Sequence, residues 1–368
     1  MPARTFQGSL SFPQDARPAL TIGNFDGVHR GHQSLLARLT ERARALGVPS
    51  CVYTFEPPPR RVLQPDRCPP RMTSLRQKIE LLHGQGVDLV VVEDFTIELA
   101  SRPAEWFARE ILGARLRPSA LVVGYDFRFG RGRQGDADAL AAWMPELSIE
   151  AVRPFLMPGE DRVVSSSAVR EAVAAGDVTR AAALLGRPYA IEGVVIHGDA
   201  RGRTIGFPTA NLQTDAELLP APGVYAVDVD VVGGAQGLRG VANLGVRPTF
   251  GKLGFTIEAH LLNFAGDLYG ETLSMRLLKR LRGEERFAGA SRPSSPRFTS
   301  PWPPPARCHR LDQRPHPDLR PRRSSGAAQP LPGDAQRALR KAEPRRGVPR
   351  LRRRSPPRRG RDRRDPHP

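Results

Sequence analysis

The stretch of residues 21–32, T-I-G-N-F-D-G-V-H-R-G-H, decides the fold of the first half of this 368-residue chain. Ala19, Leu20 and Ile22 form an apolar run that predicts a buried strand, and residues 33–45 predict a helix after the glycine-rich loop. A strand, a tight loop and a helix in this order point free backbone N–H groups and the positive end of the helix dipole at an anion, usually a phosphate. The sequence therefore predicts a phosphate-binding turn here.

Two histidines sharpen this prediction. His29 and His32 are three residues apart, so their rings face the same side of the first helical turn, and Gly31 has no side chain to keep a phosphate chain away. A single histidine more often satisfies a core or surface hydrogen bond, but a pair at a helix N-terminus suits a triphosphate whose charge must be held while its α-phosphorus is attacked. We expect the phosphate-binding residues of this turn to be Gly23, Asn24, Phe25 and Gly31.

Residues 23–32 resemble a known signature. H-x-G-H after a G-x-F-D-G-x strand end is similar to the nucleotidyltransferase motif, and G-N-F-D-G-V-H-R-G-H is close to its version in the bacterial bifunctional riboflavin kinase/FAD synthetase family. Other adenylyltransferases share the motif, so the order of further motifs decides between families. The resemblance implies adenylyl transfer, in which the phosphate of FMN attacks the α-phosphorus of ATP and pyrophosphate leaves. His29 and His32 would then stabilise charge.

The charge of the chain is concentrated in its C-terminal part. Residues 291–368 carry 22 Lys/Arg and 6 Asp/Glu, a net charge of +16, which leaves 34 basic and 32 acidic residues, a net charge of +2, in residues 1–290. The total of +18 therefore does not indicate a nucleic-acid partner for the body of the chain, whose partners must be sought from its sites.

Cysteines and apolar runs bear on the compartment. Cys51, Cys68 and Cys308 are scattered without C-x-x-C spacing, so they indicate neither a zinc site nor a disulfide framework. Residues 1–20 lack the apolar core of a signal peptide, and no apolar run is long enough to span a bilayer. We expect a cytoplasmic protein that is not bound to a membrane.

Strand and helix patterns alternate through residues 1–186, which predicts an α/β domain with a parallel, doubly wound sheet and a ligand crevice at the carboxyl ends of its strands. The predicted strands after the opening unit are residues 50–55, 87–92, 119–123 and 149–152, and the predicted helices are residues 74–85, 103–112, 137–144, 165–174 and 178–185.

The pattern changes near Gly186. Residues 191–197, 223–232, 239–246 and 255–262 are β-rich and separated by Gly/Pro turns without long helices, which predicts a small antiparallel β-barrel over residues 187–290. Residues 291–368 hold 17 of the 37 prolines and many arginines, a composition that cannot build a core, so we expect a disordered basic tail.

Two further motifs fall in the first domain. G-Y-D-F-R-F-G at residues 124–130 resembles the loop V-G-x-D-F-R-F-G of the family, which implies that Gly124, Asp126 and Phe127 meet the nucleotide or flavin. Alone, this segment would more often be an ordinary strand-to-loop turn with Phe127 and Phe129 in the core. The order of motifs in one doubly wound domain favours the functional interpretation.

V-S-S-S-A-V-R at residues 164–170 resembles the I-S-S-T-x-I-R motif of the family, which implies contacts of Ser165, Ser166 and Ser167 with ATP and a charge-stabilising role for Arg170. Serines at this place also cap a helix without any catalytic part, and an arginine offers a planar fork to phosphate oxygens. One departure concerns the segment F-E-P-P-P, where Pro58 replaces the histidine of the family pattern F-x-P-H-P.

The barrel carries the second set of motifs. H-G-D-A-R-G-R-T-I-G-F-P-T-A-N-L at residues 197–212 predicts a phosphate-covering loop with Gly198, Arg201 and Gly202. P-T-A-N resembles the flavokinase signature, which implies that Thr209 and Asn211 hold Mg²⁺ and the phosphates of ATP.

Glu258 is the predicted base of the kinase. It lies in T-I-E-A-H-L-L-N-F, where Ile257 and Ala259 would face the other side of the strand. The E-x-H strand of the family implies that Glu258 draws the proton from the riboflavin 5′-hydroxyl, with His260 orienting it. A solvent-facing strand glutamate is the alternative.

The resemblance ends near residue 290, where the family continues with an apolar helix that packs on the barrel. If the serines are encoded as TCN, starting each codon one base earlier turns Ser291, Ser294, Ser295 and Phe298 into apolar residues at helical spacing, so we hypothesise that a frameshift near residues 288–291 replaced this helix. An intact in-frame gene and the mass of the native protein would refute this. The rival interpretation is a selected basic tail that binds RNA, DNA or anionic lipid, although only Phe298 and Trp302 could stack on bases.

The resemblance thus implies an enzyme of FAD biosynthesis that phosphorylates riboflavin to FMN and adenylylates FMN to FAD. Its expected cofactors are ATP and Mg²⁺, its flavins are substrate and product, and no specific nucleic acid is expected among its partners. The alternatives are FAD synthesis alone, because the barrel has lost its closing helix, and a nucleic-acid-binding protein that acts through the tail.

Overall fold

The computed structural model describes residues 3–197, 209–249, 252–264 and 266–283. Contacts divide the chain into two units, residues 1–301 and 302–368, and every described residue belongs to the first. The predicted tail, including Cys308, lies outside the described residues, and Cys51 and Cys68 are free thiols. In the described part, no helix has the length and apolar character that crossing a membrane requires.

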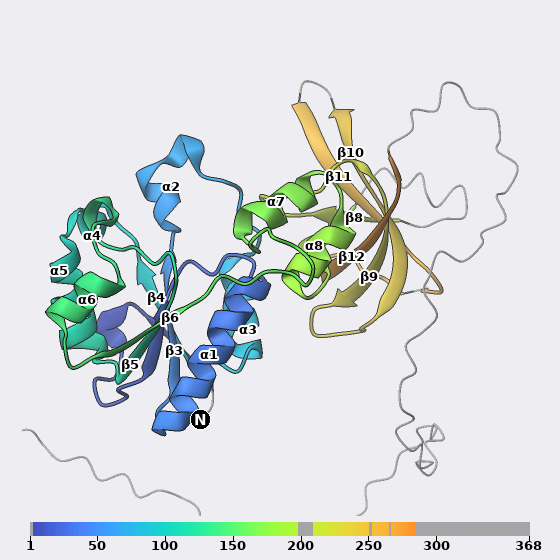
Figure 1. Cartoon of the computed structure of the whole chain (residues 1–368). Helices are drawn as coiled ribbons and strands as arrows, with labels where there is room; N and C mark the ends of the chain where they lie inside the picture. The colour runs from blue at the N-terminus through green and yellow to red at the C-terminus, as the bar shows by residue number, and fades with distance from the viewer. Residues whose placement is uncertain (1–2, 198–208, 250–251, 265, 284–368) are drawn as a thin grey trace, which may run out of the picture. The chain divides into compact units, whose positions relative to one another are not determined.

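The first sheet is parallel, as the sequence predicts, and contains six strands, one more than predicted (Figure 1). Its order is β1-β4-β3-β2-β5-β6, so the opening strand β2 lies inside it. The strands are β1 (Arg4–Gln7), β2 (Ala19–Ile22), β3 (Ser50–Glu56), β4 (Leu89–Asp94), β5 (Ala120–Gly124) and β6 (Ser148–Val152). β1 was not predicted, because four residues with no fully buried side chain give little hydrophobic pattern.

Helices cover both faces of this sheet, α1 (Arg30–Leu46) and α3 (Leu75–Gly84) on one side (Figure 1). Neighbouring residues of one strand enter different cores: Val122 packs with Leu36 and Leu39 of α1, whereas Leu121 packs with the other face. That face carries α5 (Ala104–Trp106), the π-helical segment η3 (Phe107–Leu116) and α6 (Ala137–Trp143). Two-sided burial explains why these strands are apolar throughout. The short helices are α2 (Pro59–Leu63) and α4 (Ile97–Ser101).

Two boundaries differ from the prediction for local reasons. α1 begins at Arg30, three residues before the predicted start, because the His29 side chain caps it. The helix predicted at 103–112 extends to Leu116, because the chain widens into the π-helical turn η3. α3 starts after Ser74, whose side chain forms a capping box with Gln77.

α7 (Ser166–Ala174) and α8 (Val178–Leu185) follow the sheet in the chain. Their buried side chains, such as Val169 and Leu184, belong to one apolar cluster with barrel residues such as Val195 and Tyr225. The ends of α8 match the predicted helix. The domain boundary near Gly186 stays a prediction.

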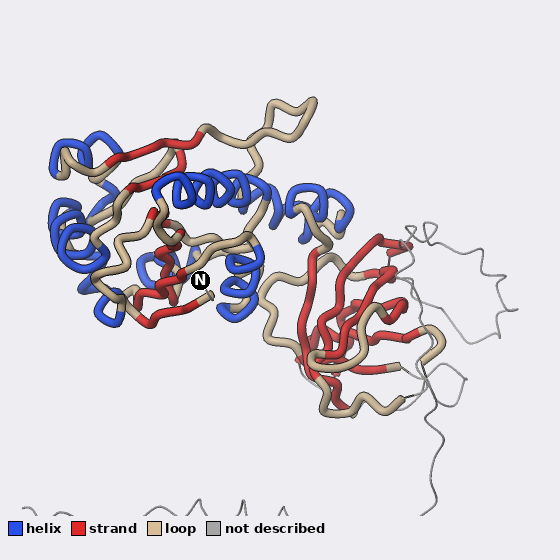
Figure 2. The backbone as a smooth tube through the Cα atoms, turned by 90° about the horizontal axis from the view of Figure 1, so that it is seen from below, coloured by secondary structure: helices blue, strands red, loops and turns tan. Residues whose placement is uncertain are grey.

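The second sheet is a closed antiparallel barrel in the order β10-β11-β8-β7-β12-β9, which confirms the predicted fold (Figure 2). Its strands are β7 (Tyr189–Ile196), β8 (Ala210–Gln213), β9 (Gly223–Val231), β10 (Leu238–Thr249), β11 (Lys252–Leu261) and β12 (Thr272–Gly283). The prediction missed β8, which has four residues, and β12, where alternating apolar side chains are interspersed with arginine and lysine.

Candidate active sites

His29 and His32 form one unit at the start of α1. The rings are stacked, with centroids 3.7 Å apart and planes 16° from parallel. His29 Nδ1 accepts a hydrogen bond from the backbone N–H of His32 at 3.3 Å, so His29 is the N-cap of the helix. The prediction that both rings face the same way is confirmed, and the positive end of the helix dipole lies beside them.

The two rings are neutral at pH 7. Burial, followed by the positive charges of Arg170 and Arg187, lowers the pKa of His29 to about 4. Burial and the neighbouring His29 lower the pKa of His32 well below its usual 6.5. His32 Nδ1 is buried and has no hydrogen-bond partner among the described residues. The pair therefore offers neutral imidazoles, not fixed cations, to an incoming phosphate.

Lowering the pH is expected to destabilise the folded chain between about pH 6.5 and 4 through His29. In this window the unfolded chain binds a proton that the native ring does not, so this contribution to stability is fully present above pH 6.5 and is lost as the pH falls towards 4. Chemical denaturation at a series of pH values measures the free energy of unfolding. In His29→Gln, which cannot titrate there, the dependence on pH should be shallower, and an unchanged dependence would contradict the assignment.

A cavity of about 320 Å³ joins the segments that the sequence singled out in the first domain. It opens at the carboxyl ends of β2, β5 and β6 and at the start of α1 and α7, as expected for a doubly wound sheet. The predicted site residues that line it are Gly23, Phe25, His29, Gly31, His32, Gly124, Asp126, Phe127, Ser165 and Ser166. Asn24, Ser167 and Arg170 do not line it.

Close packing explains the glycine between the histidines. A Cβ atom at Gly31 would lie 3.1 Å from the carbonyl oxygen of Val164 and 3.2 Å from the His29 ring. Larger residues would thus push α1 away from the segment that leads into α7. Ser165 caps α7 by accepting from the Ala168 N–H at 3.3 Å, whereas Ser166, also predicted as a cap, is the first helical residue and faces the cavity.

Asp26 is the functional candidate that the sequence reasoning missed. Its carboxylate, 6% exposed, accepts from the backbone N–H groups of Met72 and Thr73 at 3.0 and 3.2 Å and from Arg170 Nη2 at 2.5 Å. Arg170 Nε also donates to the Pro70 carbonyl at 2.8 Å. Arg170 is therefore tied to the turn through Asp26. The available signal in the sequence was an acidic residue in F-D-G, three residues before His29.

The barrel brings two of its predicted residues together. Asn211 of β8 and Glu258 of β11 are directly paired across the strands, which places their side chains on the same face. Ile257 and Ala259 are buried inside the barrel, so the predicted alternation is confirmed. Thr209 lies two residues before Asn211, immediately before β8 begins. Gly198, Arg201 and Gly202 lie outside the described residues.

The predicted magnesium ligands of the barrel have a suitable donor type. Within the described ranges, no group of three or more His, Cys, Asp or Glu could hold a metal by itself. Thr209 and Asn211 supply hard oxygen donors, the type that Mg²⁺ prefers when phosphates complete its coordination. The sequence reasoning missed His197, which directly follows the last residue of β7. Its ring stacks on that of Tyr269, with centroids 3.8 Å apart.

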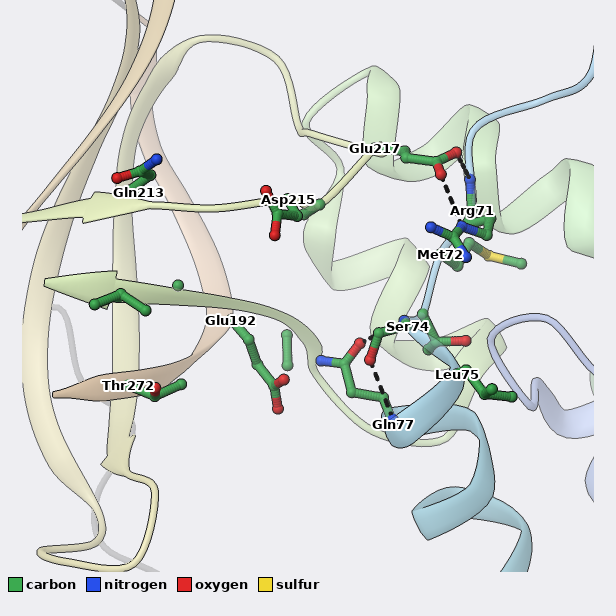
Figure 3. A pocket seen from close by; sticks show the side chains of 15 residues that line it. Arg71, Met72, Ser74, Leu75, Gln77, Glu192, Gln213, Asp215, Glu217 and Thr272 are labelled. Carbon is green, nitrogen blue, oxygen red and sulfur yellow. Dashed lines mark hydrogen bonds and ion pairs between the residues drawn. The ribbon is translucent and has the colours of Figure 1, made fainter. Parts of the chain in front are cut away.

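A second cavity of about 460 Å³ lies where residues 71–77 approach β7, β8 and β12 (Figure 3). Glu192 and Asp215 project into this space, while Arg71 is held by Glu217, its Nε donating at 2.7 Å. None of the predicted site residues lines this cavity.

Comparison with known proteins accounts for both halves. Residues 12–168 match the family model for FAD synthetase, and residues 185–292 match the model for riboflavin kinase. The bifunctional riboflavin kinase/FMN adenylyltransferase of Escherichia coli (strain K12) is 45% identical over 271 residues, covering 73% of this chain and 86% of that protein. The chain belongs to the bifunctional riboflavin kinase/FMN adenylyltransferase family.

Two further members of the bifunctional riboflavin kinase/FMN adenylyltransferase family are also similar to this chain. The protein of Pseudomonas fluorescens is 47% identical over 279 residues, which cover 75% of this chain and 88% of that one, and the protein of Bacillus subtilis (strain 168) is 36% identical over 284 residues. A solved structure titled as a macrolide-efflux protein from Streptococcus pneumoniae superposes with a TM-score of 0.72 at 31% identity, covering 78% of this chain and 94% of that one. The family resemblance seen in the motifs is thus confirmed.

Proposed function

We propose that this chain makes FAD in two ATP-dependent steps, each at its own site: riboflavin is phosphorylated to FMN on the barrel, and FMN is adenylylated to FAD on the α/β domain. The observation that carries the proposal is the stacked His29–His32 pair facing one cavity with Gly124, Ser165 and Ser166. Family membership supports both reactions.

For adenylyl transfer, we propose that His29, His32 and the N-terminus of α1 hold the phosphates of ATP. An oxygen of the FMN phosphate forms a bond to the α-phosphorus, and the bond from that phosphorus to the oxygen bridging to the β-phosphorus breaks, so pyrophosphate leaves. His29 Nδ1 already accepts from the helix backbone, which argues against a nucleophilic role and supports charge stabilisation and positioning. Arg170 would act at longer range, since Asp26 holds its guanidinium.

The remaining adenylyl-transfer assignments follow the cavity. We propose that Gly23, Phe25, Gly31 and the two cavity-lining serines contact ATP. Gly124, Asp126 and Phe127 would contact the nucleotide or the flavin. Asn24 and Ser167 do not line the cavity, but they keep their predicted roles in phosphate binding as part of the same proposal.

For riboflavin phosphorylation, we propose Glu258 as the base. It takes the proton of the 5′-hydroxyl while that oxygen attacks the γ-phosphorus of ATP and ADP leaves. Thr209 and Asn211 would hold Mg²⁺, which when bound offsets the negative charge of the phosphates, and the pairing of Asn211 with Glu258 supports a shared site. Gly198, Arg201 and Gly202 keep their predicted phosphate role.

A product assay tests the proposal. The chain is incubated with riboflavin, ATP and Mg²⁺ in one reaction and with FMN, ATP and Mg²⁺ in another, and flavins are separated by chromatography. We expect FMN and FAD in the first reaction and FAD in the second. FAD from FMN without any FMN from riboflavin would leave only the adenylyltransferase, and no FAD from FMN would refute the main proposal.

A further inference from the structure

The turn that precedes His29 has an unusual backbone. Phe25, Gly27 and Val28 all have positive φ angles, 50°, 75° and 40°. The left-handed region suits glycine, but a β-branched residue such as Val28 is rarely found there, and such a conformation persists only where surrounding groups hold it. Because Val28 is directly followed by His29, whatever holds this turn also sets the position of the catalytic ring.

Arg187 is one of the groups that hold the turn. Its Nη2 donates to the carbonyl oxygen of Gly27 at 2.7 Å, and its Nη1 donates to that of Val28 at 3.2 Å. A guanidinium presents donors in a rigid plane, so one arginine fixes two successive carbonyls in a way that a lysine cannot. Gln33 Nε2 adds a bond to the Val28 carbonyl at 2.9 Å, and Asp26 ties the start of the turn to Met72.

Arg187 also brings positive charge to the histidines. It is half-buried, and burial lowers its pKa to about 10, so it stays positive at pH 7. No carboxylate of the described residues forms an ion pair with it, unlike Arg170, which is paired with Asp26. The groups whose charge or ring acts on His29 are His32 on α1, Arg170 on α7 and Arg187.

Arg187 contacts Gly27 and Val28 in the FAD synthetase segment but does not itself belong to that segment. The FAD synthetase match ends at residue 168, whereas Arg187 falls within the riboflavin kinase match of residues 185–292, two residues before β7 begins. We infer that Arg187 is a positioning residue of the adenylyl-transfer site, which fixes the turn at residues 27–28 and thereby His29. This inference rests on the proposed function. The FAD-forming half of the chain is thus complete only with a residue from the kinase half.

Two variants of the full chain separate two properties of Arg187: the paired hydrogen bonds that its guanidinium donates, and its positive charge. Arg187→Met removes both, and Arg187→Lys keeps only the charge. With either variant we expect kcat for FAD formation from FMN to fall about 10²-fold, because a small displacement of a catalytic group costs about this much, while KM for ATP changes less than about threefold. With methionine alone, the pKa of His29, followed by NMR, should rise towards its ordinary value, because a positive charge has gone.

The controls exclude a general loss of structure. Arg76→Met removes another arginine that joins the α/β domain to β7, through Glu192, but does not touch the turn, so FAD formation should stay at the rate of the unchanged chain. FMN formation from riboflavin by the Arg187 variants should also be unchanged. FAD formation at the original rate in Arg187→Met, or equal losses of FMN and FAD formation together with a lower Tm, would overturn the inference. No FAD from the unchanged chain would instead refute the proposed function.

Discussion

When His29 and His32 are both replaced by alanine, we expect the rate of FAD formation from FMN and ATP to fall by a factor of about 10³ or more. Removing one preorganised hydrogen-bond donor from a site of developing charge typically costs about 10²–10³ in kcat. Here both rings go at once, and with them the cap of α1, since His29 Nδ1 accepts from the His32 N–H. The initial rate of FAD formation at saturating FMN and ATP measures this loss.

His83→Ala is the matched control for this pair. His83 belongs to the same domain but lies on α3, where Nδ1 is 2.8 Å from the Val87 carbonyl oxygen and Nε2 is 3.2 Å from Thr5. Its removal should lower stability without lowering the rate of FAD formation comparably. FMN formation from riboflavin should be unaffected in both variants. A double-alanine chain that keeps more than a tenth of its FAD-forming rate would show that the histidines do not carry the reaction.

Glu258→Gln is expected to do the reverse: FMN formation falls by about 10²–10⁴-fold, and FAD formation from added FMN is spared. Glutamine keeps the shape of the side chain and its place opposite Asn211, but it cannot take the proton of the 5′-hydroxyl. Production of ADP that depends on riboflavin, measured beside the chromatographic assay, reports the same step independently of later adenylylation.

Glu271→Gln serves as the control for Glu258. Glu271 is an exposed glutamate of the same barrel, just before β12, and is not paired with the P-T-A-N segment. Its change should leave FMN formation within about twofold of the unchanged chain, as is usual for an exposed position away from special features. If both glutamate variants form FMN at the original rate, the base must be another group. If neither the unchanged chain nor any variant forms FMN, the kinase half of the proposal fails, while the test of the histidines stands.

Much of the α/β domain could be predicted because its information is local. A fully buried strand such as β2 is apolar along its whole length, and caps such as Ser74 and Asp177 mark helix starts within a few residues. The closeness of His29 and His32 also follows from helical spacing alone. The joint cavity followed from a rule about parallel sheets, which brings strand ends together whatever the loops contain.

Contacts between distant segments could not be predicted in this way. The carboxylate of Asp26 is bound by Arg170, which is 144 residues further along the chain, and Arg187 is 160 residues from Gly27. No periodicity connects such positions, because their proximity depends on how α7 and the start of the barrel fold back on the turn. β8 was missed for a different reason: four residues with one fully buried side chain are too few to show alternation. The origin of the tail stays a hypothesis.

The pairing of β8 with β11 makes the proposed kinase site sensitive to chain length as well as to residue type. Successive side chains of a strand point to opposite faces, so deleting or inserting one residue beside Asn211 would exchange it with Leu212, turning an amide into the apolar interior and a leucine towards Glu258. Every residue proposed to act in phosphorylation would still be present in such a chain. The proposed phosphorylation site therefore depends on the number of residues within β8 as well as on their identity, and a one-residue length change inside this strand is a route by which the barrel could lose its chemistry while keeping its composition.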